Sequence, residues 1–133
     1  MNVVVLHSDT AEGAAALAAA VHEARVRGTG LTVLSTLSGS DEPRSAEVER
    51  EVLTARVAGD VPADVDWDVD LVAPGADAAG SLIERIERLD PVLVVLGSRS
   101  RSTVGKLLLG RTLQRILLDV TAQILVVKTP TPA

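Results

Sequence analysis

The fold is decided by residues 92–112, which read VLVVLGSRSRSTVGKLLLGRT. The stretch opens with an apolar run from Val92 to Leu96, and such a short run is typical of a strand covered on both faces of a parallel sheet. Residues 97–106 are expected to form a loop of Gly, Ser and Arg, and residues 107–118 have the spacing of an amphipathic helix. The segment therefore predicts a central strand, a polar loop at its carboxyl end and a helix that packs back on the sheet.

Strand and helix patterns alternate along the rest of the chain. The predicted strands are 3–6, 31–37, 65–72, 92–96 and 124–127, and the predicted helices are one that ends near residue 27 and those at 45–57, 77–89 and 107–118. Asp9 and Glu12 have capping-box spacing at the start of the first helix, and Gly28 is a suitable stop. Strands separated by helices are parallel and have right-handed crossovers. We expect an α/β fold with a doubly wound, five-stranded parallel sheet, forming one domain over residues 1–133.

In the predicted strand 65–72, residues 65–71 alternate strictly between apolar side chains and aspartates. A period of two is typical of a strand with one face packed and one face open to solvent. Asp66, Asp68 and Asp70 share the polar face, and charge of this kind protects the edge of a sheet from unwanted pairing. We therefore expect this strand at an edge, with the aspartates in solvent.

Composition excludes several classes of function. The chain has 133 residues, 47% of them hydrophobic, with one Trp, no Tyr and no Phe, a net charge of −5 and no Cys. Nucleic-acid binding is not expected, because it needs basic surface and aromatic stacking. Disulfides, thiolate catalysis and Cys-based metal sites are excluded. The longest apolar run, residues 14–21, is shorter than the ~20 residues of a membrane span. We expect no membrane association and a cytoplasmic location.

The loop and helix after residue 96 carry the features of an anion site. Residues 97–118 contain five basic side chains and no acidic one, whereas the rest of the chain has eight basic and eighteen acidic residues. The basic residues are Arg99, Arg101, Lys106, Arg111 and Arg115. Glycines and a helix N-terminus at the carboxyl end of a strand favour phosphate binding. A solvated loop followed by an ordinary amphipathic helix is the alternative. Neither a Walker P-loop nor a G-x-G-x-x-G fingerprint is present.

Residues 92–127 resemble the C-terminal half of universal stress protein domains. That family has a G-x2-G-x9-G-(S/T) motif after its fourth strand, and Gly97 and Gly110 match the first and last glycines with the family spacing. The apolar fifth strand, the helix start at Thr10, the Gly75 turn and the total length extend the resemblance over the whole chain. The resemblance implies a doubly wound, Rossmann-like sheet of the adenine-nucleotide alpha-hydrolase type, with the five parallel strands in the order 3-2-1-4-5.

Three positions depart from the family's nucleotide-binding pattern. The second motif glycine is Ser100, the hydroxyl residue after the last glycine is Arg111, and the acidic residue at the end of the first strand is Ser8, with Asp9 one residue late. Arg111 has two interpretations. It either supplies a stronger phosphate contact than a hydroxyl, or it fills the site and excludes the ligand. His7, which closes the first strand, is expected to cap or to face solvent.

The resemblance implies an ATP-binding stress-response module with weakened affinity, in which any Mg²⁺ arrives on the nucleotide's phosphates. The implied cofactor-binding residues are Ser8, Asp9, Thr10, Thr36, Gly97, Ser98, Arg99, Ser100, Gly110, Arg111 and Thr112. Adenine is expected near Ser8 and Thr36, and the phosphates near the two glycine segments. No catalytic residue, no metal ligand and no enzymatic activity are expected.

The alternative is a nucleotide-free, homodimeric interaction module. In either case the predicted dimer forms through the fifth strand, which is apolar and lies at a sheet edge, and which the family commonly pairs across a two-fold axis. Its residues are Ile124, Leu125, Val126 and Val127.

Overall fold

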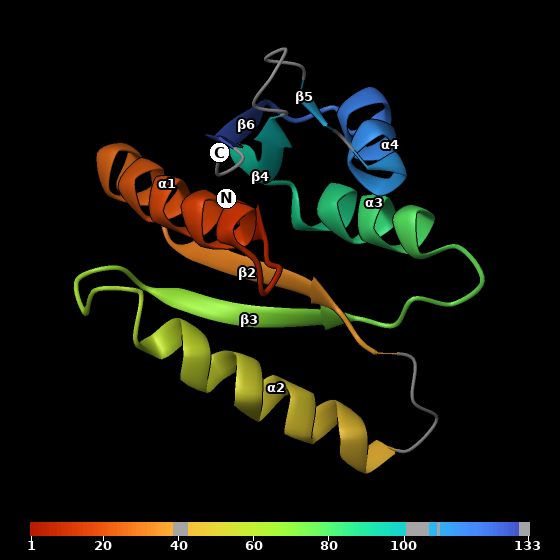
Figure 1. Ribbon diagram of the computed structural model, residues 1–133. Helices are drawn as coiled ribbons and strands as arrows, with labels where there is room; N and C mark the ends of the chain where they lie inside the picture. The colour runs from red at the N-terminus through yellow and green to blue at the C-terminus, as the bar shows by residue number, and fades with distance from the viewer. Residues whose placement is uncertain (39–42, 101–106, 109, 131–133) are drawn as a thin grey trace.

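The protein is an α/β sandwich built on one twisted sheet (Figure 1). The computed structural model describes residues 1–38, 43–100, 107–108 and 110–130. The strands are β1 (Val3–Leu6), β2 (Leu31–Thr36), β3 (Trp67–Val72), β4 (Leu93–Ser100), β5 (Leu107–Leu108) and β6 (Ile124–Pro130). The helices are α1 (Ala11–Arg27), α2 (Pro43–Ala58), α3 (Ala78–Leu89) and α4 (Arg111–Asp119).

Five parallel strands form the sheet in the order β3-β2-β1-β4-β6. Numbered along the chain without the two-residue β5, this is the predicted order 3-2-1-4-5, which is confirmed. The register places Val3 beside Leu31 on one side and beside Leu93 on the other. β1 and β4 are therefore central strands, and their carboxyl ends lie next to each other.

Alternate residues of the central strands supply two separate cores. Val3 and Val5 pack with α1 and α2 on one face, and Val4 packs with α3 and α4 on the other. Figure 1 shows α1 on one side of β4 and α3 and α4 on the other. Because all three valines are essentially inaccessible to solvent, β1 is fully covered, as expected for the centre of a doubly wound sheet.

The ends of α1 are set by local chemistry. Gly28 ends the helix with a φ of 67°, a left-handed conformation that glycine adopts without strain. At the other end the N-cap is Thr10, whose hydroxyl accepts a hydrogen bond from the Gly13 N–H at 3.1 Å. The predicted capping box that starts at Asp9 is therefore wrong. The Asp9 carboxylate lies 2.9 Å from Arg56 of α2 instead.

The segment after the central strand differs from its prediction. β4 continues to Ser100 instead of ending at Leu96, because β6 runs beside it as far as Pro130 and supplies backbone partners. Residues 107–108, predicted as the start of the last helix, form β5, which pairs antiparallel with the end of β4. α4 begins only after Gly110. The run of leucines satisfied a helical period, but pairing with β4 overrode it.

β3 lies at the edge of the sheet, as predicted, but its polar face is not all in solvent. Asp70 is half-buried and forms an ion pair with Arg85 of α3. Asp68 accepts a hydrogen bond from the Thr32 hydroxyl at 2.8 Å. α3 thus covers part of the face that the alternation alone assigned to solvent. In the ranges the structure describes, no helix combines the length and the apolar character needed to cross a membrane.

Candidate functional site

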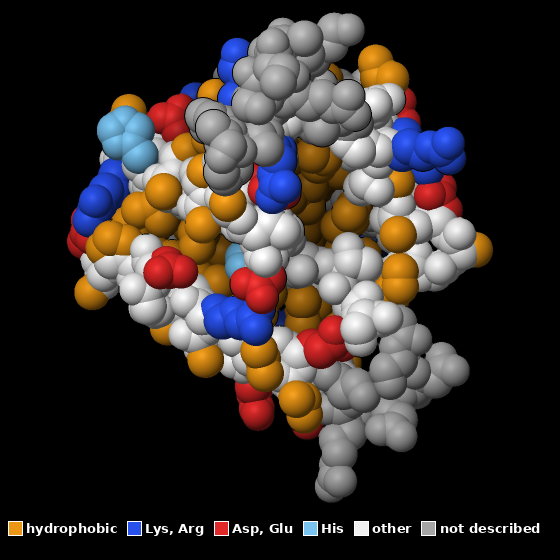
Figure 2. Space-filling view, viewed as in Figure 1, with side chains coloured by type: hydrophobic (Ala, Val, Ile, Leu, Met, Phe, Trp, Pro, Cys, Tyr) orange, Lys and Arg blue, Asp and Glu red, His pale blue; other side chains and the backbone are white. Residues whose placement is uncertain are grey.

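A cavity of about 520 Å³ opens where the carboxyl ends of β1, β2 and β4 meet the start of α4. Figure 2 shows this hollow near the middle of the molecule, with apolar side chains on its floor and charged ones at its rim. β1 pairs with β2 on one side and with β4 on the other, and the chain leaves these strands toward opposite sides of the sheet. In open α/β sheets this reversal is where ligands bind. The cavity is lined by Leu6, His7, Ser8, Thr10, Glu12, Ser35, Thr36, Leu82, Gly97, Ser98, Arg99, Gly110, Thr112 and Leu113.

Most of the residues that the sequence assigned to a nucleotide site line this cavity. They are Ser8, Thr10, Thr36, Gly97, Ser98, Arg99, Gly110 and Thr112. Four separate segments contribute them, and the sheet brings these segments to one edge. The fold therefore brings together segments that are far apart in the sequence, namely residues 8–10, 36, 97–99 and 110–112.

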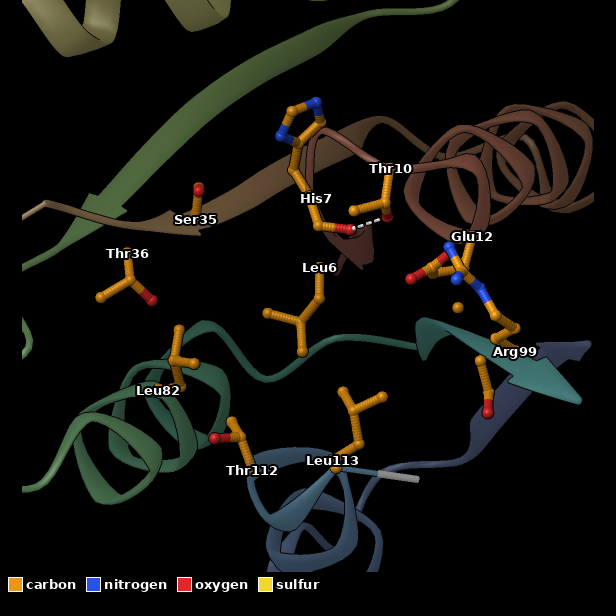
Figure 3. A pocket seen from close by; sticks show the side chains of 14 residues that line it. Leu6, His7, Thr10, Glu12, Ser35, Thr36, Leu82, Arg99, Thr112 and Leu113 are labelled. Carbon is orange, nitrogen blue, oxygen red and sulfur yellow. Dashed lines mark hydrogen bonds and ion pairs between the residues drawn. The ribbon is translucent and has the colours of Figure 1, made fainter. Parts of the chain in front are cut away.

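Three of the assigned residues do not line the cavity. Asp9 is turned toward Arg56, beside a second hollow under α2. Arg111 is exposed at the first position of α4, and its neighbour Thr112 faces the cavity in its place (Figure 3). The backbone of Ser100 is the last of β4, and its side chain lies outside what the structure describes. Arg111 therefore does not fill the cavity.

The two helix N-termini beside the cavity differ in their caps. At α1, Thr10 accepts the Gly13 N–H, and the Glu12 carboxylate accepts its own backbone N–H. At α4 the N-cap is Gly110, which has no side chain to accept a hydrogen bond. The first N–H groups of a helix have no partner within the helix and carry partial positive charge. The start of α4 is consequently the better anion site of the two.

Different structural features explain why positions 97 and 110 of the motif are glycines. A Cβ at Gly97 would lie 2.2 Å from the carbonyl oxygen of Glu12, so a side chain there is excluded by the close passage of α1 over β4. A Cβ at Gly110 would meet nothing within 4 Å, and its φ of −63° suits any residue. Packing explains the glycine at 97. At 110 the absence of a side chain leaves open space beside the start of α4.

The basic cluster predicted from the sequence is partly neutralised by acids from other elements. Arg99 Nη2 lies 3.1 Å from Glu12 Oε2, and Arg115 Nη1 lies 2.6 Å from Asp77 Oδ1. Arg101 and Lys106 lie outside the described residues. Both acids are supplied from helix starts distant in sequence, α1 and α3. The absence of acids within residues 97–118 therefore does not mean an uncompensated positive surface.

His7 lines the cavity, although the sequence favoured a capping or solvent-facing role for it. It is half-buried, and it borders both the cavity and a second hollow of about 290 Å³ under α2. In Figure 3 its ring points away from Leu6 and from the middle of the cavity. Burial is the main cause that lowers the pKa of His7, while the nearby Asp9 acts in the opposite direction. The imidazole is therefore neutral at pH 7.

The remaining lining residues were not predicted as part of a site. They are Leu6, Glu12, Ser35, Leu82 and Leu113. Leu6 and Ser35 lie at the carboxyl ends of their strands, so the position of the switch point could have indicated them. Leu82 and Leu113 belong to the apolar stripes of α3 and α4, where nothing in the pattern separates a cavity wall from core.

Comparison with known proteins agrees with this geometry. The model of the family described as the universal stress protein family matches residues 1–128. A universal stress protein of Mycolicibacterium smegmatis is 35% identical over 131 residues, covering 95% of this chain and 96% of that protein. A solved universal stress protein of Archaeoglobus fulgidus superposes with a TM-score of 0.78 at 23% identity, covering 96% of this chain and 98% of that one.

A second solved structure, of the universal stress protein from Archaeoglobus fulgidus in complex with dAMP, superposes with a TM-score of 0.73 at 18% identity, over 96% of this chain and 98% of the other. The resemblance drawn from Gly97, Gly110 and the apolar fifth strand is thus confirmed at the level of sequence, of family model and of fold. The glycine motif, the five-stranded sheet and the matched relative lead to one assignment: the chain belongs to the universal stress protein family.

Proposed function

We propose that this protein binds an adenine nucleotide in the cavity between β1 and β4, as a stress-response module that does not turn the nucleotide over. The observation that carries the proposal is the start of α4, where Gly110 leaves the helix N-terminus without a side-chain cap and with open space in front of it. The family assignment and the dAMP held by a protein of the same fold support the choice of ligand.

The cavity offers separate environments for a base and a phosphate. Its volume of about 520 Å³ is within the ordinary range for small-molecule sites. Figure 3 shows Thr36 at one side of the cavity and Leu6 near its middle, and between them an uncharged base finds both a hydroxyl and apolar surface. Thr112 presents a hydroxyl to the cavity from the first turn of α4. A phosphate there would accept from that hydroxyl and from the helix N–H groups.

Weakened affinity is part of the proposal. At the family's acidic position Ser8 has a short hydroxyl side chain, and this hydroxyl is hydrogen-bonded to the Thr10 hydroxyl at 2.8 Å. At the family's hydroxyl position Arg111 is turned out of the cavity. Thr112 supplies a hydroxyl one residue later. The adenosine end thus loses a charged contact, while the phosphate end keeps a neutral one.

Binding without catalysis is supported by the contacts that the carboxylate on the cavity wall already makes. Glu12 is the one carboxylate on the described lining, and it is engaged with Arg99 and with its own backbone N–H. A group held in this way is a poor general base. The expected cytoplasmic location remains a prediction, to be tested by cell fractionation.

Calorimetric titration with AMP and with ATP, with and without Mg²⁺, tests the proposal. A saturable heat with one nucleotide per chain is the expected result. Adenine absorbance released on denaturing freshly purified protein would be a second positive result. Absence of binding by every adenine nucleotide at millimolar concentration would contradict the proposal.

The second candidate function is a nucleotide-free, homodimeric interaction module. Exposed leucines on two consecutive elements favour it: Leu118 of α4 is 81% exposed, and Leu125 of β6 is 36% exposed. β6 pairs with β4 on one side only in the described sheet. A second copy could add its own β6 there. If titration finds no nucleotide and light scattering finds a dimer, this second function replaces the first.

A further inference from the structure

Glu12 places a carboxylate at the rim of the proposed nucleotide cavity. It lies in the first turn of α1, and its side chain is 23% exposed. Glu12 Oε2 accepts from Arg99 Nη2 at 3.1 Å, and Figure 3 shows the two side chains side by side on one wall. Among the described lining residues, these are the two that carry a formal charge at neutral pH.

Both charges persist at neutral pH and oppose each other. The backbone N–H of Glu12, followed by its contact with Arg99, lowers the pKa of this carboxyl, so Glu12 is ionised. Burial lowers the pKa of His7, so the imidazole adds no positive charge. The guanidinium of Arg99 is thus already matched by an acid. The described wall has no surplus cation for the extra charges of a polyphosphate.

The position of Glu12 makes the length of the phosphate chain matter. A first phosphate at the start of α4 is held by N–H groups and by the Thr112 hydroxyl, away from Glu12 (Figure 3). Each further phosphate adds negative charge to the same hollow. A chain that extends toward Arg99 either approaches the Glu12 carboxylate or separates it from Arg99, and both events cost binding free energy.

We infer that Glu12 is a specificity-determining residue, which makes this cavity select adenine nucleoside monophosphates over triphosphates. The inference rests on the proposed nucleotide-binding function and adds the class of nucleotide to it. It also attributes the weakened ATP affinity expected from the sequence to Glu12, a residue outside the glycine motif.

The test is a titration of AMP and of ATP, both in EDTA, into the natural protein and two variants. Glu12→Gln keeps the size and an acceptor for Arg99 but removes the charge. Glu47→Gln removes the same charge from the exposed surface of α2 and serves as the control for net charge. Circular dichroism spectra confirm that each variant is folded.

The natural protein is expected to bind AMP more tightly than ATP. Glu12→Gln should shift the ATP-to-AMP affinity ratio toward ATP by about tenfold, because removing one negative charge beside two additional phosphate charges has an effect of that order. Glu47→Gln should leave the ratio within about twofold, since exposed distant charges are screened. Added Mg²⁺ should reduce the preference of the natural protein for AMP over ATP, because the cation neutralises part of the charge on the ATP phosphates.

The possible failures are distinguishable. If AMP and ATP bind but Glu12→Gln leaves their ratio as in the natural protein, the inference is wrong and nucleotide binding stands. If Glu47→Gln moves the ratio as much as Glu12→Gln, the preference reflects net charge and the inference is also wrong. If neither nucleotide binds to any of the three proteins, the proposed function fails and this inference fails with it.

Discussion

Arg115 of α4 donates from Nη1 to Oδ1 of Asp77 at 2.6 Å, and Asp77 is also the N-cap of α3. The same carboxylate oxygen accepts the Gly80 N–H at 3.2 Å. Asp77 thus caps the start of α3 and also contacts α4, whose first turn lines the cavity. The relationship connects the packing of two helices on one face of the sheet with the placement of the proposed phosphate site.

Loss of the charge at Asp77 should weaken nucleotide binding without unfolding the protein. Asp77→Asn keeps a good N-cap for α3 but loses the ion pair with Arg115. AMP affinity should fall about twofold to fivefold, because α4 is held less firmly. Asp64→Asn is the matched control, since it removes the exposed pair with Arg25 at a distance from the cavity. Equal affinities of the two variants would contradict a positioning role for Asp77.

The stability contributed by the Asp77 charge should depend on pH. The contact with Arg115, followed by the Gly80 N–H, lowers the pKa of Asp77 below its ordinary value of 3.8. A carboxyl with a lowered pKa in the folded state stabilises the protein above its unfolded pKa, and this contribution is lost as the pH falls through the folded value. The difference in unfolding free energy between the natural protein and Asp77→Asn should be full at pH 6 and should shrink below pH 3.8. Urea unfolding at several pH values measures it, and a constant difference down to pH 2 would be the opposing result.

The two motif glycines should respond differently to alanine. Gly97→Ala forces a methyl group against the Glu12 carbonyl and should destabilise the protein by at least about 2 kcal/mol. Gly110→Ala places a methyl in open space and should cost about 1 kcal/mol or less, mainly through poorer N-capping. Chemical denaturation of both variants measures the contrast. A larger cost at 110 than at 97 would show that the packing of α1 on β4 is not the reason for Gly97.

Adjacent residues of α4 should have unequal effects on nucleotide affinity. Thr112→Val removes a hydroxyl from the cavity wall and should weaken AMP binding about tenfold, since a hydrogen bond to a charged group is worth roughly 1.5–3 kcal/mol. Arg111→Ala should change affinity by about twofold or less, because this side chain does not line the cavity. Titration calorimetry compares the two. A large loss with Arg111→Ala would show that the arginine turns inward when nucleotide binds.

The proposed homodimer predicts an effect of charge on β6. Leu125→Lys puts a cation on the exposed edge strand and should shift the protein to monomers at micromolar concentration. Val26→Lys is the control, since Val26 is 69% exposed on α1 and is not part of the edge strand. Light scattering after size exclusion measures both masses. A natural protein that is monomeric under these conditions would contradict the dimer.

Much of the fold could be predicted because its determinants are local. The apolar run of β4 and the stop at Gly28 each follow from neighbouring residues in the sequence. The errors occurred where a distant segment competed with a local pattern. Leu107 and Leu108 fitted a helical period, yet backbone pairing with β4 made them a strand. β4 is longer than its apolar run because β6 lies alongside it.

The sequence by itself determined the α/β class and the family, since periodicity and glycine spacing are local properties of the chain, and the strand order was expected from the family resemblance. Only the tertiary structure decided the charge of the candidate site. Glu12 and Arg99 are 87 positions apart, and they meet because α1 crosses β4 closely at Gly97. It also decided which residue of α4 faces the cavity, because successive residues of a helix point in directions about 100° apart. The docking of α4 against α3 turned Thr112 inward and left Arg111 in solvent.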